Sequence, residues 1–273
     1  MNKRQDSPLG RATDYPDHYD ASLLFPIARA GERAALGIAA ATPFTGVDLW
    51  TAYEISWLDP RGKPQLAIGS LRVPADSPAI VESKSLKLYL GSFAQELLPD
   101  RDAVARRITV DLTRACGARV EVALTPSVGF GRLAISELPG ESLDNLESGV
   151  DTYTPSKELL AAADSPVQET LRSALFRSNC PVTGQPDYAD ILVRYRGPRI
   201  DRASLLRYLV SYRKHAAFHE ACVERIFVDV LERCRPEALT VYARFMRRGG
   251  IDINPFRSNF EAAPSSSDRT PRQ

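Results

Sequence analysis

Two residues that could carry out nucleophilic chemistry flank one short polar loop. Cys180 stands in residues 178–187, which read SNCPVTGQPD, and Asp187 closes that segment. A thiolate in such a loop can act as a nucleophile, and the carboxyl group could donate a proton. A free cysteine is more often a small buried hydrophobic residue, and Asp187 could simply cap the turn. The pair alone therefore leaves catalysis and structure open.

A second group of polar residues surrounds the predicted start of a helix. Residues 81–87 read VESKSLK, which brings together a carboxylate (Glu82), a hydroxyl (Ser83) and an amine (Lys84). Ser83 is the predicted N-cap, and a helix N-terminus favours an anion, to which Lys84 could add a phosphate contact. The alternative is a capped helix start in solvent.

The basic turn RRGG at residues 247–250 also has two interpretations. It could be a hairpin turn with solvated charges. It could instead be a phosphate clamp, because arginine binds phosphate through two parallel hydrogen bonds. In that case Lys84 and Arg248 could share one polyphosphate ligand.

His215 and His219 lie four residues apart and are followed by Glu220 and Cys222, so that a helix here would place three possible metal ligands near one face. Their order differs from the His-Glu-x-x-His arrangement of zinc proteases, so zinc is the weaker alternative. A recognition role is better motivated for His219 and Glu220, because a carboxylate can accept two N–H bonds from a purine-like edge.

Composition limits the class of protein. The chain has 273 residues and a formal net charge of +1, which indicates no general polyelectrolyte partner. Its apolar runs are too short to span a bilayer, and its first residues lack the apolar core of a signal peptide. The cysteines include no CxxC pair and are expected to be reduced thiols. We therefore expect a cytoplasmic protein.

The chain contains an internal repeat. When the sequence is shifted by 119 positions, ten of the 38 residues from Ser85 to Val122 are identical to residues 204–241. Chance would give roughly two or three identities at typical residue frequencies. Self-similarity at a fixed offset is typical of a duplicated structural unit.

Each copy shows the same order of elements: two strands, two helices and two strands. We expect the first copy at residues 52–58, 65–73, 83–95, 102–114, 119–124 and 131–137, and the second at 167–176, 188–195, 202–214, 220–233, 239–247 and from 251 onward. An antiparallel sheet with paired helices on one face is an α+β architecture.

The expected organisation has five segments. They are a flexible N-terminal segment (1–20), a first module (21–140), a linker (141–155), a second module with Cys180 and Asp187 (156–260), and a disordered tail (261–273). The thiol loop occurs only in the second copy, and the residues around Glu82 occur only in the first. This division suggests a site assembled between copies or between chains.

Three segments together resemble the QueF family of nitrile reductases. Residues 82–89 (ESKSLKLY) are similar to its signature, residues 179–187 (NCPVTGQPD) to its catalytic loop, and residues 218–227 (FHEACVERIF) to its substrate segment. The resemblance covers nearly the whole chain outside the tails, includes residues 247–255, and is closest to the long two-module type. It implies two tandem tunnelling-fold modules, each an antiparallel four-stranded sheet with two helices on one face.

The resemblance also implies a reaction. Family members use NADPH, without a Rossmann fingerprint, to reduce 7-cyano-7-deazaguanine to 7-aminomethyl-7-deazaguanine through a covalent thioimide, in the biosynthesis of queuosine for tRNA. It implies a homodimer that needs no metal and contacts neither nucleic acid nor membrane directly. The residues implicated are Cys180 and Asp187 in catalysis; Val81, Glu82, Ser83, His219 and Glu220 in substrate binding; and Ser83, Lys84, Arg248 and Gly249 in cofactor binding.

Two other classes stay open. One is a zinc-dependent hydrolase related to the GTP cyclohydrolases, which share this fold. The other is a non-catalytic nucleotide-binding module, which would bind the deazapurine without oxidising NADPH.

Overall fold

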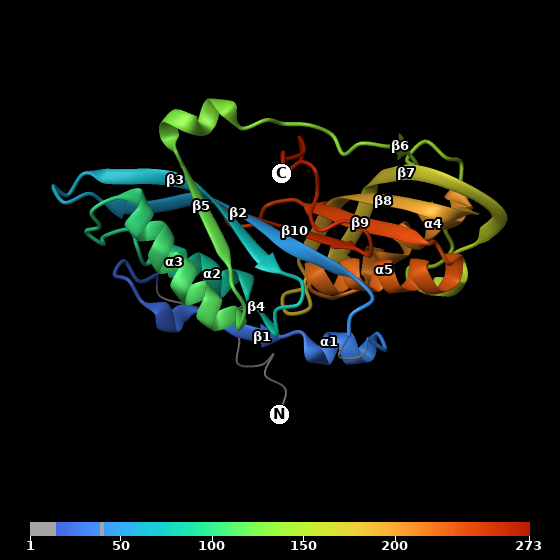
Figure 1. The fold of residues 1–273 in the computed structure, drawn as a ribbon, viewed down its shortest axis with the longest axis horizontal. Coiled ribbons are helices and arrows are strands. Elements are labelled where there is room, and N and C mark those ends of the chain that lie inside the picture. Colours follow the sequence, from blue (N-terminus) through green and yellow to red (C-terminus); the bar gives the residue numbers. More distant parts are fainter. Residues whose placement is uncertain (1–14, 39–40) are drawn as a thin grey trace. The chain divides into compact units, whose positions relative to one another are not determined.

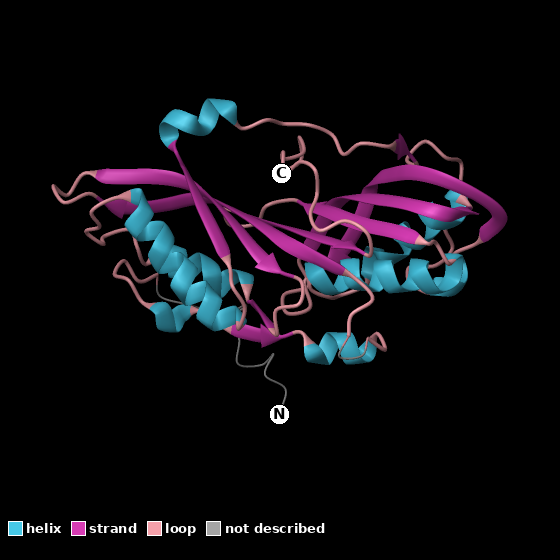
Figure 2. Cartoon of the chain, in the orientation of Figure 1, coloured by secondary structure: helices cyan, strands magenta, loops and turns pink. Residues whose placement is uncertain are grey.

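The computed structural model describes residues 15–38 and 41–273, so the predictions for residues 1–14 lie outside it. It confirms the α+β class, with sheets and a small number of helices (Figures 1 and 2). The chain forms two compact units. Of the described residues, unit 1 takes 15–31, 48–134 and 247–253, and unit 2 takes 32–38, 41–47, 135–246 and 254–273. The finer assignment to two tunnelling-fold modules stays a prediction.

Unit 1 contains the elements around the predicted helix start. In its sheet, β3 lies between β5 and β2, and a separate ladder joins β1 to β4. The bounds are η2 (Ala21–Leu23), β1 (Pro26–Ala28), β2 (Thr45–Leu58), β3 (Pro64–Pro74), β4 (Ala79–Val81), α2 (Ser83–Gly91), α3 (Arg101–Cys116) and β5 (Glu121–Pro126). The first residues of β2 belong to unit 2.

Helical spacing explains how α2 and α3 cover their sheet. On α3, Val104, Ile108 and Leu112 recur at every fourth position and all are buried. They join Ile55 and Leu71 of the strands in one hydrophobic core. Asp100 caps the start of this helix, and Gly117 ends it in the left-handed conformation that glycine tolerates.

Unit 2 contains the predicted thiol loop. Its strands follow the order β10–β9–β8–β7–β6, in which β7 to β10 pair antiparallel. The bounds are α1 (Ala30–Ala35), β6 (Glu141–Ser142), η4 (Lys157–Leu159), β7 (Ala162–Asn179), β8 (Pro186–Ile200), α4 (Arg202–Val210), η5 (Ser211–Lys214), α5 (His219–Cys234), β9 (Ala238–Phe245) and β10 (Ile251–Ser258). The first residues of α1 and β10 belong to unit 1.

The two faces of β9 have different surroundings. Leu239, Val241, Ala243 and Phe245 belong to the hydrophobic core that α4 and α5 cover. Because side chains alternate along a strand, Thr240, Tyr242 and Arg244 point to the opposite face. We call this opposite side the helix-free face of unit 2.

Two predicted segments differ in the structure. Residues 131–137 form no strand; a 3-10 helix, η3 (Ser127–Arg132), leads into irregular chain. Gly129 and Gly131 weaken strand propensity here. The predicted disordered tail also has defined contacts, since Gln273 is 6% exposed and its side chain donates to Phe245 O at 2.8 Å. The predicted domain boundaries as a whole stay a prediction.

The repeat is present, but its offset changes within each copy. Ser85 and Ser204 each donate their hydroxyl to a carbonyl three residues earlier, and Tyr89 and Tyr208 are likewise 119 apart. In the next helices the offset is 118, because α3 ends at Cys116 and α5 ends at Cys234. The ungapped shift is therefore wrong by one residue there, because the connection before α5 is one residue shorter.

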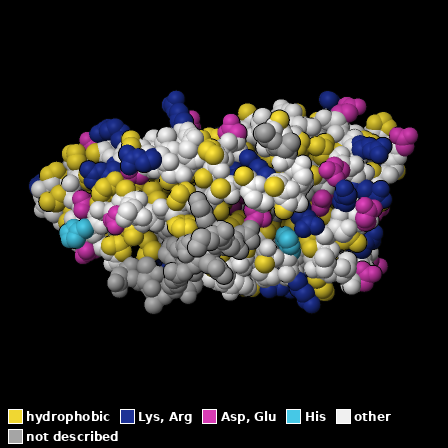
Figure 3. Space-filling view, turned by 90° about the horizontal axis from the view of Figure 1, so that it is seen from below, with side chains coloured by type: hydrophobic (Ala, Val, Ile, Leu, Met, Phe, Trp, Pro, Cys, Tyr) yellow, Lys and Arg dark blue, Asp and Glu magenta, His cyan; other side chains and the backbone are white. Residues whose placement is uncertain are grey.

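Surface charge agrees with the composition. On the face drawn in Figure 3, basic and acidic side chains are interspersed over the described residues.

Candidate active site

A tight turn between β7 and β8 holds Cys180. The Cys180 amide donates to Gln185 O at 2.9 Å, and its carbonyl accepts from the Gly184 amide at 3.0 Å. Gly184 has φ of +70°, a conformation that glycine adopts without strain. Cys180 is 3% exposed, so its thiol is more deeply covered than the polar sequence of the loop suggested.

The residue before the thiol ties this turn to the start of α5. Asn179 donates its amide to His215 O at 2.8 Å and accepts from the Ala217 amide at 3.1 Å. The chain then enters α5 at His219. This backbone pairing explains how the predicted substrate residues reach the predicted catalytic loop, 39 residues earlier in the sequence.

Asp187 and His219 are in contact. Asp187 lies on β8, opposite Ser178 of β7. Its Oδ1 lies 3.4 Å from His219 Nε2, so that Asp187 joins Cys180 and His219 around this turn. Both residues are buried. The ring of Phe245 lies 4.1 Å from the His219 ring, centre to centre, and limits its rotation. A carboxyl group beside an imidazole can pass a proton to a reacting atom.

Glu220 lies in the first turn of α5 and is 3% exposed. Its neighbour Cys222 is fully buried, and burial raises the pKa of that thiol to about 12. The Ser178 hydroxyl opposes this rise, and the Asp187 and Glu220 carboxylates add to it. Cys222 is thus a protonated thiol beside the site. The sequence alone had offered it only as a metal ligand.

In unit 1 the helix cap is Glu82 and not Ser83. The Glu82 carboxylate accepts from the Lys84 amide at 2.7 Å and from the Ser85 amide at 2.9 Å. Ser83 is the first residue of α2, and its hydroxyl lies 3.3 Å from Glu82 Oε1. Val81 precedes them in β4 and is buried. Glu82 therefore has a structural role whether or not it binds a ligand.

The predicted cofactor residues all lie in unit 1. Gly249 has φ of +60°, and a Cβ there would meet the Lys87 side chain, with Nζ at 2.9 Å. The glycine turn thus lies against α2, where Lys84 and Lys87 are three residues apart and share a face. Together with Arg248, these amines fit the phosphates of a dinucleotide. Lys87 belongs to the VESKSLK segment, but nothing in the sequence marked it as a ligand-binding residue.

The geometry does not support the arrangement proposed for zinc. His215 follows η5 outside α5, whereas His219 begins α5, so the two do not share a helix face. Burial lowers the pKa of His215, and the nearby Arg225 lowers it further. Within residues 15–38 and 41–273, no group of three or more His, Cys, Asp or Glu is placed to hold a metal.

The described helices are all too short or too polar to cross a membrane.

The sequence was compared with known families and proteins. A family model described as "Nitrile reductase, 7-cyano-7-deazaguanine-reductase N-term" matches residues 15–124, and one described as "QueF-like protein" matches residues 186–264. The chain is 58% identical to the NADPH-dependent 7-cyano-7-deazaguanine reductase of Burkholderia vietnamiensis, over 98% of this chain and 99% of that protein. It is 56% identical to the enzyme of that name from Paraburkholderia xenovorans, with the same coverage.

A solved structure titled an archaeosine synthase QueF-Like in the apo form is also similar in part. It is 20% identical, with a TM-score of 0.31, and covers 36% of this chain and 95% of its own. A likeness this slight supports no conclusion about the fold.

Proposed function

The chain belongs to the family of NADPH-dependent 7-cyano-7-deazaguanine reductases, and from that premise we propose that it reduces the nitrile of 7-cyano-7-deazaguanine to the primary amine in queuosine biosynthesis through a covalent thioimide on Cys180. The observation that carries the residue assignment is the cluster on one turn. The backbone of Cys180 makes the hydrogen bonds that form this turn between β7 and β8. Asp187 follows the turn on β8, with its Oδ1 3.4 Å from His219 Nε2.

The first step is addition of the thiol to the nitrile. The sulfur of Cys180 bonds to the nitrile carbon as its S–H bond breaks, the nitrile nitrogen takes a proton from Asp187, and the carboxylate left on Asp187 takes up the proton of the thiol. The sum is addition of one thiol across the triple bond, with no change in overall charge. A protonated thioimide accepts hydride more readily than a nitrile does, which is the chemical reason for covalent catalysis here.

NADPH, when bound, supplies the two hydride equivalents that conversion of a nitrile to an amine consumes. We propose that Lys84, Lys87 and Arg248 bind the phosphates of NADPH. The cofactor would approach the backbone closely at Ser83 and Gly249. The support for this assignment is the position of the glycine turn against α2.

Substrate recognition is assigned mainly to Glu220. A carboxylate there can accept from both the ring N–H and the exocyclic amine of a guanine-like edge, while His219 orients the base. Val81, Glu82 and Ser83 are the proposed substrate contacts in unit 1. A site that pairs with N–H donors rejects analogues lacking them, because its own buried groups would lose their partners.

The decisive test uses intact-mass spectrometry with the nitrile substrate and no NADPH. The unmodified protein should gain the mass of one substrate molecule, and Cys180→Ala should gain none and have no turnover. Cys234→Ala, which removes another buried thiol of unit 2, is the matched control and should keep both properties. Full turnover by Cys180→Ala would refute the mechanism.

The same preparation separates the other classes. NADPH oxidation that depends on the nitrile is expected, which a non-catalytic binding module would not produce. Elemental analysis should find no stoichiometric metal, and a chelator should leave the rate unchanged. Stoichiometric zinc, with activity lost on chelation, would favour the hydrolase.

A further inference from the structure

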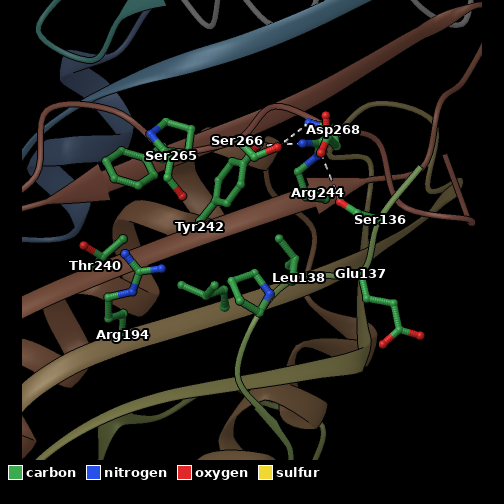
Figure 4. A pocket seen from close by; sticks show the side chains of 14 residues that line it. Ser136, Glu137, Leu138, Arg194, Thr240, Tyr242, Arg244, Ser265, Ser266 and Asp268 are labelled. Carbon is green, nitrogen blue, oxygen red and sulfur yellow. Dashed lines mark hydrogen bonds between the residues drawn. The ribbon is translucent and has the colours of Figure 1, made fainter. Parts of the chain in front are cut away.

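A cavity of about 110 Å³ lies on the helix-free face of unit 2, beneath residues 136–139 and 264–268 (Figure 4). A cavity needs roughly 10–15 Å³ of such volume to hold one water, so this one has room for several waters or a small ion. Its lining includes Arg194, Thr240, Tyr242 and Arg244 from the strands. Asp187 and Phe245 point to the other face of the sheet, so the cavity is separate from the candidate active site.

Arg244 is the notable residue of this cavity. It is 3% exposed, and its Nε donates to Gln273 Oε1 at 2.9 Å while its Nη1 donates to the Tyr242 hydroxyl at 3.0 Å. Both acceptors are uncharged. Within the described part of the chain, Arg244 forms no ion pair and its Nη2 makes no hydrogen bond. A buried charge without a counter-charge is costly, so a buried guanidinium normally has an anionic partner.

The other charged groups of the lining already have partners. Arg194 pairs with Glu261 at 2.7 Å, and Glu137 pairs with Arg172 at 2.7 Å. Asp268 also lines the cavity and accepts from the Ser136 hydroxyl at 3.4 Å, so its carboxylate opposes an anion there. Of the two arginines in the lining, Arg244 is the one without an ion pair in the described part of the chain.

We propose that this cavity binds a small oxyanion, with a phosphate or a carboxylate accepting from Arg244 Nη2. Guanidinium groups match the geometry of both anions. The site differs from the proposed cofactor site, whose Lys84 and Arg248 belong to unit 1.

The test measures thermal unfolding against phosphate concentration at constant pH and ionic strength, with chloride as the balancing salt. It uses protein carrying Lys84→Ala, Lys87→Ala and Arg248→Ala, so that phosphate cannot act through the proposed cofactor site. Phosphate should raise the midpoint saturably, because a ligand that binds the folded state stabilises it. Acetate in a parallel titration distinguishes a carboxylate site from a phosphate site.

Arg244→Gln should weaken phosphate binding roughly tenfold or more, the scale of a lost charge-assisted hydrogen bond. Arg196→Gln, which removes an exposed arginine paired with Glu237, is the control and should bind phosphate normally. Asp268→Asn should bind phosphate more tightly, because it removes a negative charge from the lining. Equal stabilisation of the Arg244→Gln and parent proteins, or no stabilisation of the parent by either anion, would overturn the proposal.

A direct measurement covers the case in which Arg244→Gln does not fold. Crystals of the unmodified protein soaked in selenate should show an anomalous peak beside Arg244 Nη2. Selenate peaks found only elsewhere, with this cavity empty, would equally overturn the proposal.

Discussion

At the scale of single residues, Glu220 and Lys84 separate the two proposed ligands. Glu220→Ala should weaken binding of the nitrile substrate by roughly 2–4 kcal/mol, on the scale of a lost pair of charge-assisted hydrogen bonds, and should change NADPH binding much less. Lys84→Ala should do the reverse. Titration calorimetry of each variant with each ligand measures both effects. If Glu220→Ala bound the nitrile normally but lost NADPH, the two assignments would have to be exchanged.

His215 should contribute to the dependence of stability on pH. Burial and Arg225 lower its pKa in the folded protein from the ordinary value of 6.5, so the unfolded chain takes up the proton first as pH falls. Above the pKa that His215 has in the unfolded chain, His215 therefore contributes nothing to the free energy of unfolding. As pH falls from about 6.5 toward its lowered pKa in the folded protein, His215 destabilises the fold.

Urea unfolding of the parent protein and His215→Gln between about pH 7.5 and pH 5 measures this contribution. The free energy of unfolding should fall less steeply for the variant, because glutamine does not titrate. Parallel curves for the two proteins would show that His215 has no such effect.

At the scale of elements, α5 is anchored one turn beyond Glu220 by a buried group of three charges. Glu224 Oε1 accepts from Arg33 Nη2 at 2.7 Å and from Arg257 Nη2 at 2.9 Å. Arg257 and Glu224 are almost completely buried. These contacts join α5 to β10 and to the segment around Arg33, and they fix the end of the helix that presents His219 and Glu220.

Glu224→Ala should lower the free energy of unfolding by about 3–5 kcal/mol, because it leaves two arginines without their shared carboxylate. Glu232→Ala is a matched control on the same helix. Its ion pair with Lys157, at 2.7 Å, is half exposed and screened by solvent, so its loss should lower the free energy of unfolding much less. Similar losses in the two variants, measured by urea unfolding, would contradict a special role for the buried charges.

At the scale of the whole molecule, the remaining prediction concerns assembly. We expect a homodimer from the family resemblance, with a mass twice the chain mass of 30.1 kDa. Among the described residues, strand β5 ends the strand order of unit 1 and pairs with β3 alone, and an unpaired strand edge is a ready surface for association. Light scattering over a range of concentrations measures the mass. A monomer at every concentration would refute the prediction.

Much of the local structure could be predicted from the sequence. The strands on both sides of the Cys180 loop, all four long helices and the glycine turn at 249–250 follow from periodicity, capping residues and turn chemistry, which act between near neighbours in the chain. The motifs that indicate the family are also local, and for that reason the proposed chemistry could be reached before the fold.

Only the tertiary structure decided how distant segments come together. The contact of His219 with Phe245, the pairing of Asn179 with residues 215–217 and the two arginines on Glu224 join residues far apart in sequence. The same holds for the assignment of residues 32–47 to unit 2 and of residues 247–253 to unit 1. It also holds for Arg244, which is buried and hydrogen-bonded to Gln273 but forms no ion pair among the described residues. Periodicity shows which face of an element is buried. The partner on that face depends on packing between elements, which no local pattern specifies.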